Sequence, residues 1–237
     1  HTAYRRQRQM CIRDRYITLT QTERLQLMHV LPDVVPSVTP TVDLEVLFGE
    51  GAGIGDHGGS GGSVFPGVFL DQAITRTAPT IQATPFHEDT RKYTLMLVDP
   101  DVPDEASNLY TTYIHWLVSN VPLSLRERTV PTGHAPLLPY VPPHPARGSP
   151  YHRYTMLLFE QGTKPVVAAA REGIDVSAFA AEHDLSLAGI HFWREKWTDK
   201  NRATVSSIYE ELQVPEPRYG HCLLYTSDAA DDMQWVD

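Results

Sequence analysis

The sequence predicts an α+β domain that is mainly β, a β-sandwich with helices at its periphery. Its 237 residues are enough for one sizeable core and favour a single domain. Short apolar runs bounded by turn residues recur through the middle of the chain, which is typical of buried strands. Helical spacing is found before and after this region. No apolar run reaches the length that a membrane-spanning helix needs.

Residues 16–41 are predicted to form a helix and a linker. Residues Tyr16 to Leu31 have helical spacing of apolar side chains, with Thr20 or Thr22 as the candidate cap. Three prolines then mark a stiff connector. Residues 42–48 alternate between apolar and polar, which predicts a half-buried strand. The glycine-rich stretch at 49–63 lacks the spacing of a phosphate-binding loop and is expected to be a surface insertion.

Three buried strands are expected further on, at residues 93–98, 113–119 and 154–159. The first leads into Asp99-Pro-Asp-Val-Pro103, where the prolines are expected to fix an acidic turn. In the second strand, a period of two puts His115 on the same face as Tyr113 and Leu117.

The last third of the chain is expected to form a helix, a strand and a second helix. The first helix begins near Asp175, and an aromatic-rich strand covers residues 188–197. Thr198 is the candidate N-cap of the final helix, which extends to Leu212.

A proline-rich loop at residues 139–154 is the most distinctive stretch. Its five prolines restrict the loop before the chain folds. The loop therefore loses little further conformational entropy when it holds polar groups in place. It carries His144, His152, Arg147 and Arg153, and it leads directly into a predicted strand. This layout predicts a binding site at the end of a sheet.

The order of these motifs resembles the phosphatidylethanolamine-binding protein (PEBP) family. The shared pieces are DPDxP, a strand with a histidine before an aromatic residue, YVPP…RGSPYHRY and a strand that ends in EQ. The resemblance covers the chain from Val42 to about Leu212, and it implies a PEBP-like β-sandwich over residues 42–221. It also implies a small pocket for phosphate, acetate or a phosphoryl head group. By position, the residues of that anion pocket are Asp99, Asp101, His115, Pro145, His152, Tyr154 and Tyr209.

Two departures from the family pattern affect the expected pocket. Pro142 and His144 stand at rim positions where the family has glycine. Proline has no N–H and therefore removes an amide donor, and the imidazole of His144 narrows the mouth. We therefore expect anion binding to be weak or vestigial.

Each motif also has a purely structural interpretation. The acidic turn alone is more often solvated, His115 alone is more often a satisfied core histidine, and Tyr209 is by default a core residue. His152 and Arg153 could merely brace the loop against the two aspartates. Histidines with aspartates also suggest a metal or an acid–base site, but neither HxxxH, HExxH nor GxSxG occurs. We expect no enzyme activity, no metal and no cofactor.

Two functions of different class follow from the resemblance. The stretches YVPPHPARGSPYHRY and AGIHFWREKW are more similar to the PEBP-like protein of the mitochondrial large ribosomal subunit than to free lipid binders. This implies a structural subunit in the mitochondrial matrix, with mitochondrial ribosomal proteins as partners and rRNA as a further candidate. The alternative is a soluble, cytoplasmic PEBP that holds a phosphate or phospholipid head group and acts as a regulatory protein or protease inhibitor.

Both ends of the chain are expected to be adaptor-derived. Met10 to Asp14 can be encoded by ATG TGT ATA AGA GAC, whose reverse complement, with flanking bases and in another frame, reads as Cys222 to Ser227. Setting aside residues 1–15 and 222–237 removes both cysteines, so no disulfide or zinc–thiolate site is expected. It also lowers the totals of 20 basic and 29 acidic residues to 15 and 24. This acidic remainder is expected to dock mainly on protein and to bind nucleic acid weakly.

Overall fold

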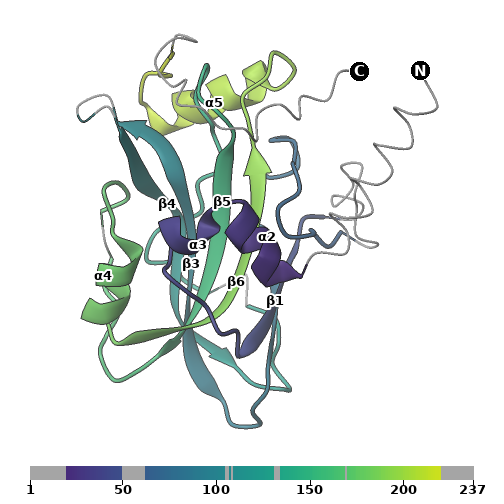
Figure 1. Ribbon diagram of the computed structural model, residues 1–237, viewed down its shortest axis with the longest axis vertical. Coiled ribbons are helices and arrows are strands. Elements are labelled where there is room, and N and C mark those ends of the chain that lie inside the picture. Colours follow the sequence, from purple (N-terminus) through teal and green to yellow (C-terminus); the bar gives the residue numbers. More distant parts are fainter. Residues whose placement is uncertain are drawn as a thin grey trace, which may run out of the picture.

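The computed structural model describes residues 20–49, 62–104, 107, 109–130, 134–168 and 170–219. Both ends expected to be adaptor-derived, and most of the glycine-rich stretch, lie outside the described residues. The described chain forms two antiparallel sheets with short helices around them (Figure 1). The predicted α+β, mainly β fold with peripheral helices is confirmed. None of the helices in the described part is long and apolar enough to cross a bilayer.

The larger sheet has four strands in the order β4-β3-β5-β6, and each pairs antiparallel with its neighbour. These strands are β3 (Arg91–Asp104), β4 (Leu109–Leu123), β5 (His152–Gln161) and β6 (Leu185–Glu195). The smaller sheet pairs β1 (Val42–Leu47) with β2 (Thr80–Pro85). Just before β1, the backbone N–H of Thr41 donates to the carbonyl O of Ala188 at 2.8 Å, which ties the small sheet to β6.

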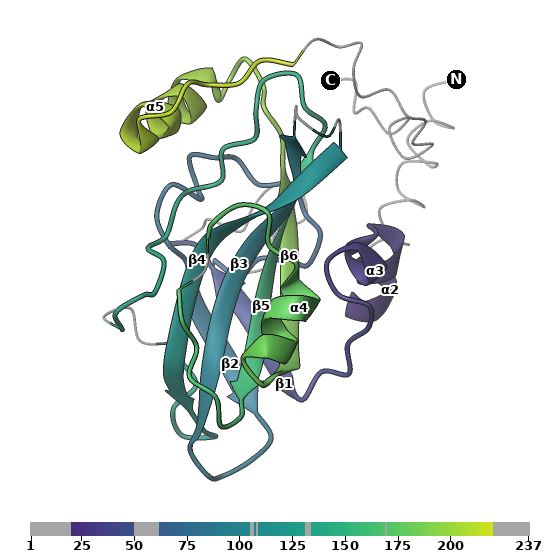
Figure 2. The same ribbon diagram turned by 90° about the vertical axis from the view of Figure 1, so that its left-hand side faces the viewer.

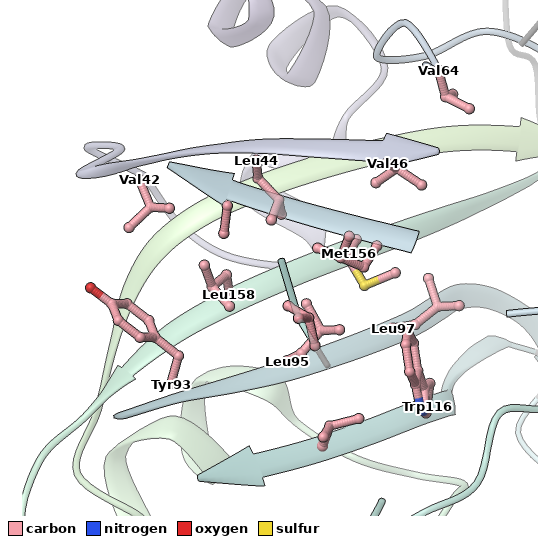
Figure 3. Close-up of a cluster of buried hydrophobic side chains, with 14 of the residues drawn as sticks. Val42, Leu44, Val46, Val64, Tyr93, Leu95, Leu97, Trp116, Met156 and Leu158 are labelled. Carbon is pink, nitrogen blue, oxygen red and sulfur yellow. The ribbon is translucent and has the colours of Figure 1, made fainter. Parts of the chain in front are cut away.

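The face of the larger sheet that points toward β1 and β2, here called the inner face, carries one hydrophobic core (Figure 3). Alternate residues of β1 pack there against alternate residues of β3 and β5, as a period of two requires. Each fully buried aliphatic side chain stabilises the fold by roughly 1.5–3 kcal/mol. Prominent members of this core are Val42, Leu44, Val46, Leu95, Leu97, Met156 and Leu158.

The opposite, outer face is covered by α2 (Gln21–Leu27), α3 (Val30–Asp33) and α4 (Val176–Glu182), as Figure 2 shows. A second core fills the space between these helices and the sheet. Its members include Leu25, Val30, Val35, Met96, Leu157, Phe179, Ile190 and Phe192. The remaining helix, α5 (Arg202–Leu212), lies beyond one end of the larger sheet.

The N-terminal helix begins at a predicted cap and ends earlier than predicted. Thr20 and Glu23 form a capping box, in which each side chain accepts a hydrogen bond from the other residue's backbone N–H. The helix predicted to run to Leu31 stops at Leu27, because His29 takes a left-handed conformation with φ 53°. Residues 16–19 of the predicted helix lie outside the described residues.

The acidic turn predicted at Asp99–Pro103 is instead a continuation of β3. A shift in strand register between Asp99 and Val102 accommodates Pro100, because a bulge leaves backbone groups that do not join the ladder, whereas Pro103 pairs in register with Tyr110. The carboxylates of this segment are thus fixed by a strand rather than by a turn.

A bulge in β4 overturns a second expectation. Leu97 pairs with Trp116 whereas the next residue of β3 pairs with Ile114, so His115 is the extra residue. The bulge breaks the period of two, and Leu117 packs in the outer-face core. His115 contacts Tyr154, a member of the inner-face core, and therefore does not share a face with Leu117.

The two later helices test a predicted start and a predicted cap. The helix predicted to begin near Asp175 does begin there, and Asp175 is its N-cap, since its carboxylate accepts from the backbone N–H of Ala178 at 2.9 Å. Thr198 is not the cap of α5, which begins only at Arg202 after Asn201. Thr198 and Asn201 bond reciprocally through side chains and backbone, which forms a turn before the helix starts.

Candidate functional site

The candidate site lies at the end of the larger sheet nearest α5 (Figure 1). All four strands of that sheet contribute to it: Asp99 comes from β3, His115 from β4, His152 from β5 and Glu195 from β6. The exposed fractions of Asp99, His115 and His152 are only 2%, 1% and 2%. These side chains therefore lie beneath the surface.

Asp99 and His152 form a buried ion pair, with 2.6 Å between Oδ2 and Nδ1. Burial opposes the charge on both groups. The charge and hydrogen bond of the partner nevertheless lower the pKa of Asp99 and raise the pKa of His152 from their ordinary values. Asp99 also accepts from the backbone N–H of Asp101 at 2.9 Å. The pair is charged at neutral pH.

The hydroxyl of Ser149 extends this pair into a chain of hydrogen bonds. Its Oγ lies 2.8 Å from Nε2 of His152 and 2.7 Å from the carbonyl O of Ala146. Since a carbonyl only accepts, Ser149 donates its one hydrogen to Ala146 and accepts from the Nε2–H of His152. The geometry of Asp99, His152 and Ser149 is thus that of a catalytic triad with the Ser–His hydrogen bond reversed. An imidazolium that already donates from both nitrogens cannot deprotonate the serine.

His115 is a neutral histidine held by the proline-rich loop. Its Nδ1 donates to the carbonyl O of Val141 at 2.8 Å, and its ring contacts those of Tyr113 and Tyr154 at 4.9 and 5.2 Å. Burial, followed by the nearby His144, lowers the pKa of His115 to about 3. It can therefore position neighbouring rings but carries no charge toward an anion at neutral pH.

The imidazole of His144 fills the space beside His115. Its ring centroid lies 5.1 Å from those of both His115 and Tyr209, and 5.6 Å from that of Tyr113. Its Nδ1 is 2.7 Å from the carbonyl O of Pro142, and its own carbonyl accepts from the hydroxyl of Tyr209 at 2.9 Å. Burial lowers the pKa of His144, so this plug is neutral as well.

The remaining predicted pocket residues are placed in different ways. Pro145 and Tyr154 are buried beside the group, and the hydroxyl of Tyr154 has no hydrogen-bond partner among the described residues. Tyr209 reaches the site from α5 through its bond to His144. Asp101, in contrast, is turned away toward Arg153.

Asp101 and Arg153 form a second pair, which fastens the N-terminal segment to the sheet. Asp101 accepts three hydrogen bonds from Arg153, from the backbone N–H, Nε and Nη2, at 2.6 to 2.8 Å. The other terminal nitrogen of Arg153 donates to the carbonyls of Met28 and His29 and to the carboxylate of Asp33. The carboxylate of Asp101 is thus engaged by a structural partner. The interpretation that His152 and Arg153 brace the loop against the two aspartates requires two pairs, and both are formed: His152 with Asp99 and Arg153 with Asp101.

Glu195 belongs to this end of the sheet and was missed by sequence analysis. It lies opposite His152 in the β5–β6 register and is fully buried. Its Oε1 accepts from Nε1 of Trp193 at 2.7 Å, and its Oε2 is 3.2 Å from Oγ1 of Thr75. Burial raises the pKa of Glu195 well above its ordinary value despite these bonds, so burial favours the protonated carboxyl. Sequence analysis could have found Glu195 from its position two residues after Trp193 in a predicted strand, which puts the two side chains on the same face.

Gly148 closes the loop over this site. It has φ 86°, and a Cβ there would lie 1.9 Å from the carbonyl O of Tyr219, so only glycine fits. The backbone N–H of Tyr219 donates to the carbonyl of Arg147 at 2.8 Å. The chain after α5 therefore crosses the proline-rich loop. No group of three or more His, Cys, Asp or Glu in the described part of the chain is arranged to hold a metal ion.

Comparison with known proteins identifies relatives of this chain. Residues 57–196 match the sequence model of the phosphatidylethanolamine-binding protein family. The chain is 29% identical over 207 residues to the large ribosomal subunit protein mL38 of Schizosaccharomyces pombe, across 84% of this chain and 65% of that protein. It thus spans just under two thirds of that relative. It is also 29% identical to CEN-like protein 1 of Nicotiana tabacum, across 76% of this chain and 96% of that protein.

Solved structures share the fold. The phosphatidylethanolamine-binding protein from Plasmodium vivax superposes with a TM-score of 0.55 at 23% identity, over 75% of this chain and 97% of that one. Carboxypeptidase Y inhibitor, complexed with its cognate proteinase, gives a TM-score of 0.59 at 21% identity, over 75% and 95%. The resemblance inferred from the sequence motifs is confirmed, and the chain belongs to the phosphatidylethanolamine-binding protein family.

Proposed function

We propose that this chain is a structural, non-enzymatic protein of the mitochondrial large ribosomal subunit. The observation that carries the proposal is the match to large ribosomal subunit protein mL38, whose prefix denotes the mitochondrial ribosome, over 84% of this chain. The proposed location is the mitochondrial matrix, and the proposed partners are mitochondrial ribosomal proteins. Its formal net charge of −9 favours docking on protein over docking on rRNA.

The geometry of the site supports a role without chemistry. The ring of His152 donates one N–H to Asp99 and the other to Ser149. The triad-like arrangement of these three residues therefore lacks a general base that could deprotonate the serine. Glu195 is fully buried, with its pKa raised by burial, and it faces the interior rather than solvent. The groups that could take part in acid–base chemistry are therefore used to hold strands and loop together.

We also propose that the anion pocket implied by Asp99, Asp101, His115, Pro145, His152, Tyr154 and Tyr209 is closed in this chain. Three features support the proposal. Asp101 is engaged by Arg153, His144 fills the space between His115 and Tyr209, and His152 spends both N–H groups on protein partners. A phosphate would also face the carboxylate of Asp99, which disfavours a second negative charge there.

The alternative is a free head-group binder or protease inhibitor of the family. It is favoured by the relation to CEN-like protein 1, which this chain matches over 96% of that protein's length. An open anion pocket would be needed for head-group binding, and that need separates the two functions.

The ribosomal proposal can be tested by sedimentation. The full chain, tagged and fused to a mitochondrial presequence, should migrate with the large-subunit peak of a mitochondrial lysate and leave that peak when the subunit is dissociated. CEN-like protein 1, fused and tagged in the same way, is the matched control and should stay at the top of the gradient. Sedimentation of this chain as a free protein beside intact subunits would contradict the proposal.

A further inference from the structure

A cluster of aromatic and basic side chains lies along the edge of β6, where Tyr151 and Arg194 adjoin His152 and Glu195 in sequence. We call it the Phe69 patch and define it as Phe65, Phe69, Tyr151, Arg194 and Lys196. Phe65 and Phe69 are 45% and 37% exposed and Lys196 is exposed, whereas Tyr151 and Arg194 are half-buried. Large aromatic side chains that stay this exposed are enriched in interaction surfaces, so the patch is a candidate docking surface.

The backbone beneath the patch is fixed. The segment from Gly67 to Leu70 runs along the free edge of β6, where Gly67 donates to the carbonyl of Phe192 at 2.7 Å and Leu70 to that of Arg194 at 2.9 Å. The N–H of Arg194 donates back to Val68 at 2.8 Å. Phe69 is thus mounted on an added strand-like segment rather than on a loose loop. A binding surface built this way loses little entropy when a partner docks.

The side chains of the patch are held in place by one another. The guanidinium of Arg194 lies over the ring of Phe69 at 4.1 Å and over that of Tyr151 at 5.2 Å, and the two rings meet edge to face at 5.8 Å. Nε of Arg194 donates to the carbonyl of Gly67 at 2.8 Å. Arg194 therefore braces both aromatic rings, which gives the patch a defined shape.

Lys196 supplies the charge that selects a partner. Its ammonium lies over the ring of Phe69 at 5.9 Å, and Lys196 is an exposed residue. In the described part of the chain this ammonium has no hydrogen bond or ion pair. An aromatic surface with a cation at its rim is complementary to a carboxylate that stands next to an apolar side chain.

We propose that the Phe69 patch is a docking site for a protein segment that carries a carboxylate beside an aliphatic residue. The geometry disfavours single-stranded RNA, because Arg194 already lies over the ring of Phe69 at 4.1 Å and competes with a base for stacking on it. The net charge of −9 also repels a polyanion more strongly than a peptide with one or two carboxylates. The proposal goes beyond the ribosomal function and does not depend on it.

The test is an NMR titration of the full ¹⁵N-labelled chain with three probes: acetyl-Leu-Asp-Leu-Glu-amide, its neutral analogue acetyl-Leu-Asn-Leu-Gln-amide, and an oligouridylate. The acidic peptide should shift the backbone amides of residues 65–70 and 194–197, and the neutral peptide should bind at least fivefold more weakly. Lys196→Glu should weaken the acidic peptide at least fivefold, and Phe69→Ala should do the same.

Lys92→Glu is the matched control, since Lys92 is also exposed but lies at the start of β3. It should change the affinity less than twofold. Both lysine variants should unfold near the wild-type temperature, and Phe69→Ala, which loses a partly buried ring, is titrated at a temperature at which its NMR spectrum shows it folded. Equal binding of the acidic and neutral peptides, or the absence of shifts at the patch, overturns the proposal. So does an oligouridylate that shifts the same amides and displaces the peptide, because the surface would then be a nucleic-acid site.

Discussion

The imidazole Nδ1 of His152 stands 2.6 Å from the carboxylate Oδ2 of Asp99, and both side chains are about 2% exposed. This contact joins the first residue of β5 to the middle of β3 and, through Ser149, fixes the proline-rich loop. A buried charged pair is costly to desolvate and is justified only by good geometry and further hydrogen bonds. Both conditions hold here, so the role of the pair is structural: it links β3, β5 and the proline-rich loop.

Removing either partner of this pair should destabilise the fold, and the two losses should not add. Asp99→Asn or His152→Gln alone leaves one buried charge uncompensated, and we expect a loss of about 3–5 kcal/mol in the free energy of unfolding. The double variant should lose clearly less than the sum of the two single losses. Urea unfolding of the four proteins measures the coupling, and strictly additive losses would show that no pair exists.

The same pair sets a pH window. The pKa of Asp99 is lowered, so its contribution to stability is present above the ordinary aspartate pKa and is lost as the pH falls through the lowered value. The pKa of His152 is raised, so its contribution is present below the ordinary histidine pKa and is lost as the pH rises through the raised value. NMR titration of the His152 ring should therefore show an imidazolium at neutral pH. A neutral ring at pH 6 would contradict this assignment and the reversed triad.

A second histidine should make the protein acid-labile. Burial lowers the pKa of His191 to about 4, and its Nε2 donates to the carbonyl of Val64 at 2.8 Å. The unfolded chain takes up this proton near pH 6.5, so stability should fall by on the order of 3 kcal/mol between pH 6.5 and 4. His191→Leu should lower the stability at pH 7 and flatten this part of the pH profile, as measured by urea unfolding. An unchanged pH slope in the variant would disprove the assignment.

Arg153 is expected to control the attachment of the N-terminal helices. Arg153→Met removes the two guanidinium bonds to Asp101, which keeps only the bond from the backbone N–H of residue 153, and it leaves the carbonyls of Met28 and His29 without this donor. We expect a cost of about 2–3 kcal/mol. Amide hydrogen exchange should rise more in residues 24–34 than in β3 or β5. Asp33→Asn is the control: it removes only a partner that is 46% exposed, and should cost less than about 1 kcal/mol. Uniform acceleration across the sheet would mean that Arg153 has no local role.

The apolar runs predicted most of the strands because burial on one or both faces of a sheet is a local property of the sequence. Residues 42–48, 93–98 and 154–159 all lie in or next to observed strands. The start of a helix near Asp175 could be predicted for the same reason, since apolar spacing is also a local property of the sequence. The bulge at His115 could not, because an extra residue in β4 is defined only by its pairing with β3.

The candidate site was less predictable because its groups are selected by long-range contacts. The order of motifs brought attention to Asp99 and His152, which lie 53 residues apart and do meet. The same motif gave no means of telling Asp99, which faces the interior, from Asp101, which faces Arg153. Glu195 escaped notice because a buried carboxyl has no sequence pattern of its own.

Replacing His144 tests the closed pocket. His144→Gly removes the ring that fills the space between His115 and Tyr209, and it should create a cavity that admits a small anion. We expect the full wild-type chain to bind phosphate and phosphorylethanolamine weakly or not at all at neutral pH. The glycine variant should bind at least tenfold more tightly, and more tightly still as the pH falls, because His115 can take a proton once solvent reaches it.

His144→Phe is the matched control, since it keeps an aromatic ring in the same place and should stay closed. Calorimetry at pH 7 and pH 5.5, with thermal unfolding to confirm that each variant is folded, distinguishes the outcomes. If the glycine and phenylalanine variants bind phosphate equally tightly, the aromatic ring at position 144 is not what closes the pocket. Micromolar phosphate binding by the wild-type chain, abolished by His152→Ala, would show that the pocket is open and would favour the head-group-binding function, because only an accessible His152 could then be the donor to the anion.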